Sequence, residues 1–239
     1  MNVALAWTGL LSLASGCRSE VTGWIISERT SPEVPGIDGG RDGGCSSCPG
    51  TIVWSAPSPT PQFGTPSGTG HDDECPNGAA LVGFQGSIDD VGVVLVSSIQ
   101  GFCGKLAIAS PTAAEVSVTL DSTLPQRGLA TNASWTQICP RDQVVVGFYG
   151  RSGNSLDQVG FDCAHVRASP NATGDWALSV DSTISELSPP NGGDGGQPYR
   201  ARCDSGQVAR VVNVNIDQWV QAFGLTCATP AVAADAGAP

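Results

Sequence analysis

Residues 142–163, DQVVVGFYGRSGNSLDQVGFDC, contain two runs in which apolar and other residues alternate. The alternating apolar positions are Val144, Val146, Phe148, Val159, Phe161 and Cys163. A segment rich in Gly, Ser and Asn, residues 150–155, separates the two runs. A period of two is typical of half-buried strands, so this stretch predicts a β-hairpin whose loop covers residues 150–155.

Cysteines mark copies of this hairpin on both sides. The spacing from Cys75 to Cys139 recurs from Cys139 to Cys203 and from Cys163 to Cys227 (139−75, 203−139 and 227−163 are equal). The spacing from Cys103 to Cys163 is shorter by four, which predicts a longer turn in the first copy. Shorter echoes support the same offsets: 83–86 matches 147–150, 223–227 matches 159–163, and 120–123 matches 180–183. Because this period exceeds the usual solenoid repeats, each unit should be a whole sheet.

Composition favours an all-β protein. The 239 residues include 31 Gly and 17 Pro, and only 14% are charged, which is typical of many strands joined by turns. We expect one domain of about twelve strands over residues 51–228, with units at about 51–103, 104–163 and 164–228. A formal charge of −11 argues against a nucleic-acid partner, because phosphate binding needs a Lys/Arg surface.

The segments outside this domain have a different composition. Residues 17–50 form a Gly/Pro-rich linker, and the breaker-rich composition continues to Gly70, so the segment up to that point is a linker or a loosely held arm. Residues 51–54 are the first candidate strand, and the small-residue tail 229–239 is expected to be disordered.

The N-terminus predicts export. Residues 2–16 are apolar and end in small residues, which is typical of a signal peptide over residues 1–16 and too short to span a bilayer. Residues 13–17, LASGC, resemble the lipobox of bacterial lipoproteins, which implies acylation of Cys17. We expect a lipid-anchored protein of the outer membrane or cell surface. The alternatives are an ordinary secreted chain and a buried N-terminal strand.

The remaining cysteines follow the repeat. Six cysteines allow fifteen connectivities, and the repeat favours the one in which each unit bridges its own strands: Cys75–Cys103, Cys139–Cys163 and Cys203–Cys227. Cys45 and Cys48 are expected to form a small disulfide of an exported protein. Two alternatives are less well supported, since no strand and helix flank this pair as in a redox motif, and no second ligand pair completes a zinc site.

Two segments carry a family resemblance. Residues 146–160, VGFYGRSGNSLDQVG, resemble the final hairpin of jacalin-related lectins, and residues 191–199, NGGDGGQPY, resemble the opening of those domains. The cysteine-framed start of each unit is also similar to vitelline membrane outer layer protein. Both resemblances imply a β-prism, in which three sheets surround a common axis.

The lectin resemblance also implies a sugar site. By position it comprises Gly153, Asn154, Ser155, Leu156 and Asp157, together with Gly192 and Gly193. A carboxylate beside backbone N–H donors can hold vicinal hydroxyls without a metal. The first unit has Ser97 at the Asp157 position and the third has Gln221, so at most one such site is expected. The alternative is that the glycines only permit turns and that Asp157 caps its own loop.

Other constellations predict no catalysis. His71 and His165 are the only histidines, and neither lies in a recognisable triad motif. The acidic run 71–74 could hold calcium but is expected to be a solvated face. We therefore expect no enzyme, no cofactor and no metal. The leading function is carbohydrate or glycoconjugate binding at a surface, with membrane contact through the lipid anchor. The alternative is a structural cell-envelope protein without a ligand site.

Overall fold

The structure, a computed structural model, describes residues 51–108, 115–170 and 176–233. All regular structure in these ranges is β-strand. Of the sixteen strands, β2, β7, β12 and β13 have two residues each, which leaves twelve longer ones (16−4) and agrees with the expected number. The expected signal peptide, Cys17, the 17–50 linker and the Cys45–Cys48 pair lie outside the described residues. Nor do these residues include a helix that could cross a bilayer.

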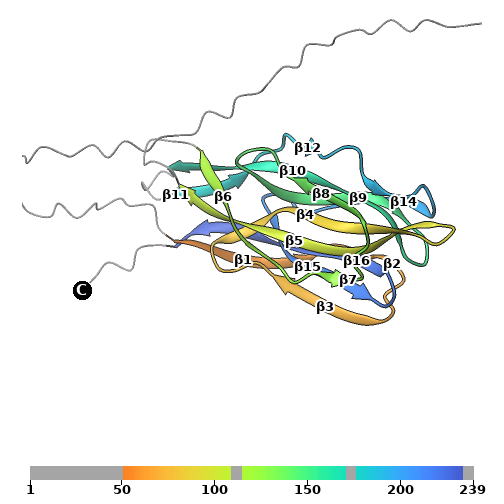
Figure 1. The fold of residues 1–239 in the computed structure, drawn as a ribbon. Helices are drawn as coiled ribbons and strands as arrows, with labels where there is room; N and C mark the ends of the chain where they lie inside the picture. The colour runs from red at the N-terminus through yellow and green to blue at the C-terminus, as the bar shows by residue number, and fades with distance from the viewer. Residues whose placement is uncertain (1–50, 109–114, 171–175, 234–239) are drawn as a thin grey trace, which may run out of the picture. The chain divides into compact units, whose positions relative to one another are not determined.

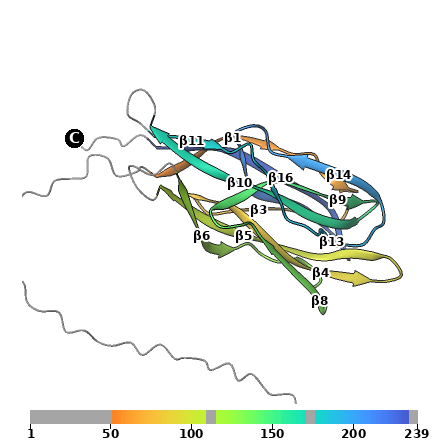
Figure 2. The ribbon, with the colours of Figure 1, turned by 90° about the horizontal axis from the view of Figure 1, so that it is seen from above.

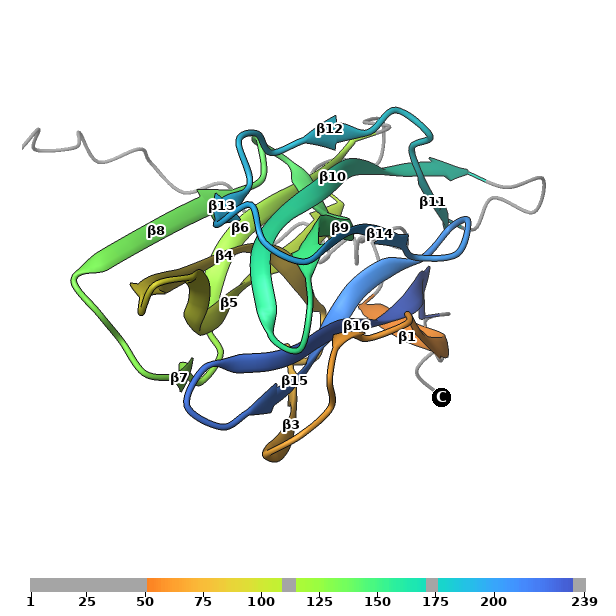
Figure 3. The ribbon, with the colours of Figure 1, turned by 90° about the vertical axis from the view of Figure 1, so that its right-hand side faces the viewer.

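Three sheets make up the domain, each built around one long antiparallel hairpin (Figures 1 and 3). Sheet I has the order β6-β5-β4-β8, with β7 paired to β5. Its strands are β4 (Ala79–Asp90), β5 (Val94–Ile108), β6 (Val116–Thr123), β7 (Arg127–Gly128) and β8 (Ala133–Ile138). Sheet II has the order β11-β10-β9-β14, with β12 and β13 paired to β10. Its strands are β9 (Gln143–Ser152), β10 (Leu156–Pro170), β11 (Trp176–Val180), β12 (Ser185–Glu186), β13 (Asn191–Gly192) and β14 (Gln197–Arg202).

Sheet III combines the two ends of the described chain. Its order is β1-β16-β15-β3, with β2 paired to β16. Its strands are β15 (Val208–Ile216), β16 (Val220–Val232), β1 (Ile52–Pro59), β2 (Phe63–Gly64) and β3 (Thr69–Glu74). The long strands β5, β10 and β16 run along the domain, with β6, β11 and β1 toward one end (Figures 1 and 2). The molecule is a three-fold pseudosymmetric β-prism, as the sequence predicts.

Two boundaries differ from those predicted. Residues 51–74 do not complete the first unit, and those up to Gly70 do not form an arm. They pair with β15 and β16 and complete sheet III. Pro57 and Pro59 are tolerated because β1 is an edge strand with a bulge between Ser55 and Ser58. The predicted tail is also wrong over 229–232, since β16 pairs with β1 as far as Val232.

The hairpin predicted from residues 142–163 is β9–β10. The strands extend further into the predicted loop than expected, because Leu156 pairs with Ser152 and leaves only residues 153–155 as the turn. Its inward side chains meet those of the other sheets at the axis, where Phe84, Phe148, Phe161 and Phe223 are fully buried. The ring centroids of Phe84 and Phe161 are 4.0 Å apart, and those of Phe148 and Phe223 are 5.0 Å apart. Each buried ring contributes about 1.5–3 kcal/mol.

The three predicted repeat disulfides are confirmed: Cys75–Cys103, Cys139–Cys163 and Cys203–Cys227. Each joins the segment that enters a sheet to the second long strand of the same sheet. The amide of the first cysteine donates to the preceding sheet in every case, to the carbonyls of Arg210, Val82 and Val146 respectively. Each disulfide therefore lies beside a junction between two sheets.

Candidate functional site

In each sheet one two-residue strand that contains a glycine pairs with the second long strand and forms a corner: β2 with β16, β7 with β5, and β13 with β10. Gly64, Gly128 and Gly192 lie at these corners, with φ of 99°, 87° and 126°. A Cβ at any of them would overlap the carbonyl oxygen of Gln221, Ser97 or Asp157 respectively. Only glycine fits this close approach. The three glycines are spaced as the repeat cysteines are, but only Gly192 was predicted as a site residue; Gly64 and Gly128 were missed, and Gly64 lies among prolines that hide the repeat.

The corner of sheet II brings together the two segments that the lectin resemblance singled out. Gly192 pairs with Gln158, and the Gly193 amide donates to the Asp157 carbonyl at 2.8 Å. Arg151 holds the rest of this loop, because its guanidinium donates to the carbonyls of Gly195 and Gly196 at 2.8 and 2.9 Å. Although the predicted unit boundaries separate the 191–196 loop from Asp157, the two lie in one sheet.

Glycines surround the carboxylate of Asp157. Asp157 is 8% exposed, and its Oδ2 has no hydrogen-bond partner within the described ranges. A Cβ on Gly196 would lie 2.6 Å from Oδ2, and a Cβ on Gly195 would overlap Oδ1. Burial raises the pKa of Asp157, while the Gly153 amide and the charge of Arg151 act in the opposite direction. The corner therefore holds a desolvated carboxylate with unused acceptor capacity.

The other predicted ligand residues are placed less favourably. Leu156 is fully buried in the core, so only its backbone could take part in the predicted site. Asn154 accepts from the Thr65 amide through its carbonyl at 3.0 Å, and the Ser155 hydroxyl donates to Gln221 Oε1 at 3.2 Å. Gly153 lies beside the Asp157 carboxylate, and a Cβ there would be 3.6 Å from Oδ2. Asp157 with its glycines is the part of the predicted set that forms one polar corner.

The corresponding corners of the other sheets lack a carboxylate. In sheet I, Ser97 is fully buried and its hydroxyl is 2.9 Å from that of Ser87. In sheet III, Gln221 occupies the position and accepts from Ser155. The structure is thus in keeping with one acidic corner among the three.

The acidic run in β3 is a solvated face at Asp72 and Glu74, as we expected, but not at Asp73. Asp73 is 8% exposed and accepts from Arg127 of sheet I at 2.7 and 2.8 Å. This ion pair joins sheet III to sheet I. Over the ranges that the structure describes, no group of three or more His, Cys, Asp or Glu side chains is arranged to hold a metal ion.

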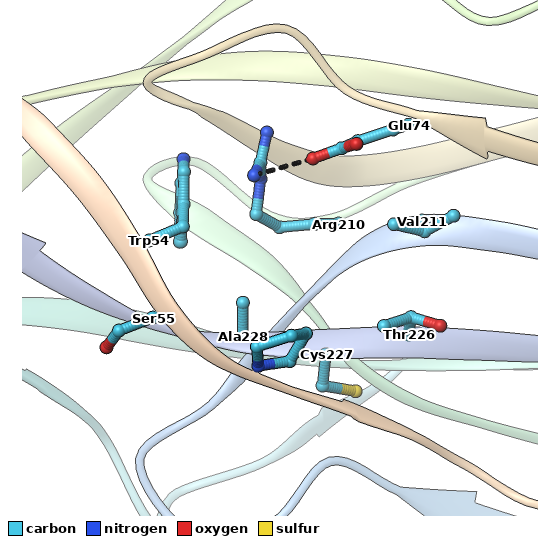
Figure 4. A pocket seen from close by; sticks show the side chains of 9 residues that line it. Trp54, Ser55, Glu74, Arg210, Val211, Thr226, Cys227 and Ala228 are labelled. Carbon is cyan, nitrogen blue, oxygen red and sulfur yellow. Dashed lines mark ion pairs between the residues drawn. The ribbon is translucent and has the colours of Figure 1, made fainter.

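A second polar constellation lies beside a crevice of about 200 Å³ on sheet III (Figure 4). The Arg210 guanidinium stacks 4.6 Å from the centre of the Trp54 ring and pairs with Glu74 at 2.9 Å. It also donates to the carbonyls of Cys75, Pro76 and Ala79, at 2.6–3.1 Å. Burial lowers the pKa of Arg210, and Glu74 opposes that effect. The guanidinium is bonded largely within the protein, so it serves to join sheets III and I.

Comparisons with known proteins give a likeness of fold. The chain matches no model of a known protein family and no curated protein in sequence. Several lectins of known structure are similar in fold. Artocarpin complexed with methyl-α-mannose has a TM-score of 0.45 and 11% identity, covering 76% of this chain and 99% of that one. A mannose-binding jacalin-related lectin from Ananas comosus has a TM-score of 0.44 and 13% identity, and the match covers 75% of this chain and 98% of that one. A prostate-specific WGA16 glycoprotein lectin has a TM-score of 0.43 and 19% identity, and the match covers 70% of this chain and 96% of that one.

Proposed function

We propose that this protein binds carbohydrate or a glycoconjugate at the Asp157 corner of sheet II. The observation that carries the proposal is the buried Asp157 carboxylate, whose Oδ2 lacks a hydrogen-bond donor among the described residues and lies against Gly153 and Gly196, while Gly195 covers Oδ1. A buried carboxylate oxygen without a donor is costly, and a sugar hydroxyl can supply that donor. The role is one of binding and requires no catalytic group.

Ligand entry involves the glycine loop that covers the carboxylate. Residues 193–196 are Gly-Asp-Gly-Gly, and the backbone conformations open to glycine allow this segment to move at low cost. Displacement of Gly195 and Gly196 exposes Oδ2 and frees the carbonyls that Arg151 holds. Arg151 can then donate to a second sugar hydroxyl, so that acceptor and donor act together on one ring.

A structural envelope protein is the second candidate, and it has an observation in its favour. The loops at this end of the domain interlock between sheets. The Thr65 amide of sheet III donates to Asn154 of sheet II at 3.0 Å, and Trp219 of sheet III donates to Asp89 of sheet I at 3.1 Å. Gly193 of sheet II lies against the Val94 carbonyl of sheet I. Such a closed set of contacts supports a rigid module that needs no ligand.

Glycan-array binding separates the two candidates. We expect the wild-type chain to bind a defined set of glycans and Asp157→Ala to lose that binding while keeping its fold and disulfides. Asp121→Ala is the matched control, because Asp121 is an exposed acid on sheet I. Loss of binding in Asp157→Ala alone supports a lectin. Absence of binding by a folded wild-type chain favours the structural module.

Export and lipid anchoring remain part of the proposal. Residues 13–17 support acylation of Cys17 after cleavage at residue 16. When the chain is expressed in a bacterium with labelled palmitate, we expect label and membrane association in the wild type and neither in Cys17→Ala. An unlabelled, freely secreted wild-type protein would contradict the lipid anchor and leave simple secretion.

A further inference from the structure

A cavity of about 190 Å³ lies in sheet I, among β4, β5, β8 and the connections that flank β7 (Figure 3 shows these strands). Side chains that line it include Gln85, Ser87, Ser98, Gln126, Thr131 and Trp135. None of its lining residues is charged, although the chain carries a formal charge of −11. The lining instead combines hydroxyl and amide groups with one indole ring. The cavity adjoins the glycine corner of this sheet, because Ser98 pairs with Gly128 and the Ser87 hydroxyl contacts that of Ser97, but neither Ser97 nor Gly128 lines it.

Pseudosymmetry explains why there is space here. In sheet II the positions of Gln85, Ser87 and Ser98 are taken by Tyr149, Arg151 and Gln158, at the offsets of the repeat cysteines. The larger Arg151 reaches across to the carbonyls of Gly195 and Gly196. Ser87, in contrast, is too short to extend over the cavity, and its hydroxyl is 2.7 Å from that of Ser98. The smaller side chains thus leave open in sheet I a space that sheet II fills.

Trp135 supplies an independent indication of a missing partner. It is 8% exposed, and its indole N–H has no acceptor among the described residues. The residue at the same position in sheet II is Tyr199, whose hydroxyl donates to the Gln158 carbonyl at 2.9 Å. Sheet II therefore satisfies the polar group at this position, whereas sheet I leaves a buried donor unpaired within the described ranges. A buried unpaired donor costs stability, and because this nitrogen is itself covered by neighbouring atoms, an acceptor reaches it only if the Trp135 ring shifts toward the cavity that it lines.

We propose that this cavity is a binding site for a small neutral polyhydroxylated molecule, of the size of one sugar ring. Its volume is below the roughly 300–1,000 Å³ of pockets for drug-sized ligands, which limits the occupant to a single ring. The absence of charge in the lining disfavours ions, because nothing compensates their desolvation. Gln126, Ser134 and Thr136 are exposed in the lining and can exchange hydrogen bonds with the hydroxyls of a polyol, and the Trp135 ring offers an apolar surface for its C–H groups. The proposal does not depend on the Asp157 corner.

The test is a titration followed through the indole N–H resonance of Trp135 in the ¹⁵N-labelled chain, assigned by its loss in Trp135→Phe. The probes are methyl α-D-mannopyranoside, methyl β-D-galactopyranoside and N-acetyl-D-glucosamine, with sodium sulfate as the charged control. We expect at least one neutral sugar to shift this resonance in a saturable way at millimolar concentration, and sulfate to leave it unchanged. Absence of a saturable shift with all three sugars overturns the proposal.

Two variants locate the site and stay informative if Trp135→Phe folds poorly. Gln126 is exposed at the rim, so Gln126→Ala should fold normally and weaken sugar binding, measured by this shift, about five-fold, as loss of one hydrogen bond implies. Gln62→Ala, an exposed glutamine of the connection between β1 and β2, should leave it unchanged. Asp157→Ala should also leave it unchanged. If Asp157→Ala abolishes the shift, the sugar binds at the Asp157 corner and the second site is refuted; equal affinities in Gln126→Ala and Gln62→Ala refute it as well.

Discussion

The carboxylate of Asp157 lies in a corner that excludes most water. Its burial destabilises the free protein, whereas the same carboxylate can accept a hydrogen bond from a ligand. Its Oδ2 has no donor within the described part of the chain, and burial raises its pKa. An aspartate whose only role was to cap its own loop would be stabilised by hydrogen bonds to both of its carboxylate oxygens. A group that is costly in the free protein and useful to a ligand is typical of functional sites.

The first prediction concerns the pH dependence of this cost. Because the folded-state pKa of Asp157 is raised, ionisation of the carboxylate destabilises the folded state as the pH rises above the ordinary Asp value of about 4. Asp157→Asn keeps the shape and removes the charge. The melting temperature of Asp157→Asn should therefore increase relative to that of the wild type as the pH rises from about 4, and the difference between the two should then become constant. Melting curves across this range check it, and a difference that stays constant or shrinks with pH contradicts it.

Arg210 shows the opposite case, a buried charge that the protein uses fully. It stands where the other two sheets have Val82 and Val146, at the offsets of the repeat cysteines. Its partners are one carboxylate, three carbonyls and the Trp54 ring. The valines show that the fold accepts an apolar residue at this position. The arginine in sheet III is therefore explained by the polar groups and the Trp54 ring that surround it there.

We predict that Arg210→Val destabilises the chain by about 2–4 kcal/mol, because it leaves buried carbonyls without donors and exposes one face of Trp54. Urea unfolding measures this. Arg167→Ala is the matched control, since Arg167 makes only partly exposed ion pairs with Glu115 and Asp181 and should cost about 1 kcal/mol or less. Equal losses in the two variants would show that the bonds of Arg210 contribute no more than a surface ion pair.

At the scale of elements, the short strands β2, β7 and β13 position the corners. Each brings a glycine with positive φ against a carbonyl of the long strand. A second set of left-handed positions, Gly78, Asp142 and Gly206, occupies the turns that open β4, β9 and β15. The two sets differ in their surroundings, because a Cβ at Gly64 would overlap Gln221 whereas nothing lies within 4 Å of one at Gly78.

This difference predicts unequal costs for the same substitution. Gly78→Ala meets only the backbone cost of a left-handed alanine, about 1–2 kcal/mol. Gly64→Ala adds the overlap with a backbone carbonyl and should cost about 3 kcal/mol or more, because β2 must separate from β16. Chemical denaturation of the two variants measures both. Equal losses would mean that the corners adapt and do not require glycine.

Much of this organisation is readable from the sequence, for identifiable reasons. The β9–β10 hairpin was predictable because both strands alternate and a Gly-rich turn separates them. The disulfides were predictable because the regular cysteine spacing gives each unit its own pair. The proximity of Asp157 to the 192–196 loop was implied only by resemblance, because it depends on how β13 crosses back over β10 after a long connection. The role of β1–β3 was missed because their prolines and charged residues hide the period of two.

At the scale of the whole molecule, the two ends of the domain meet in sheet III. The β15–β16 hairpin has β1 on one side and β3 on the other, so the third sheet exists only when residues 52–74 pair with it. Units counted from the first repeat cysteine would suggest that residues 75–239 contain all the strands of the three sheets. The pairing shows that they do not, because β1, β2 and β3 belong to sheet III.

We therefore predict that a chain beginning at Cys75 fails to fold cooperatively, whereas one beginning at Thr51 melts like the full chain. The truncation removes both neighbours of the β15–β16 hairpin and the Asp73–Arg127 ion pair, and leaves unpaired strand edges. Thermal melting and dye binding to exposed apolar surface distinguish the outcomes. A sharp, wild-type-like transition in the shorter chain would contradict the closure of sheet III as a requirement for folding.

The central claim, that the Asp157 corner binds sugar, is tested most directly by a crystal structure of the chain with a glycan selected on the array. The account predicts a sugar ring between the 153–155 turn and the 193–196 loop, with a hydroxyl donating to Asp157 Oδ2 and the loop displaced from the position described above. A sugar bound elsewhere while Asp157 stays covered by Gly195 and Gly196 would contradict it.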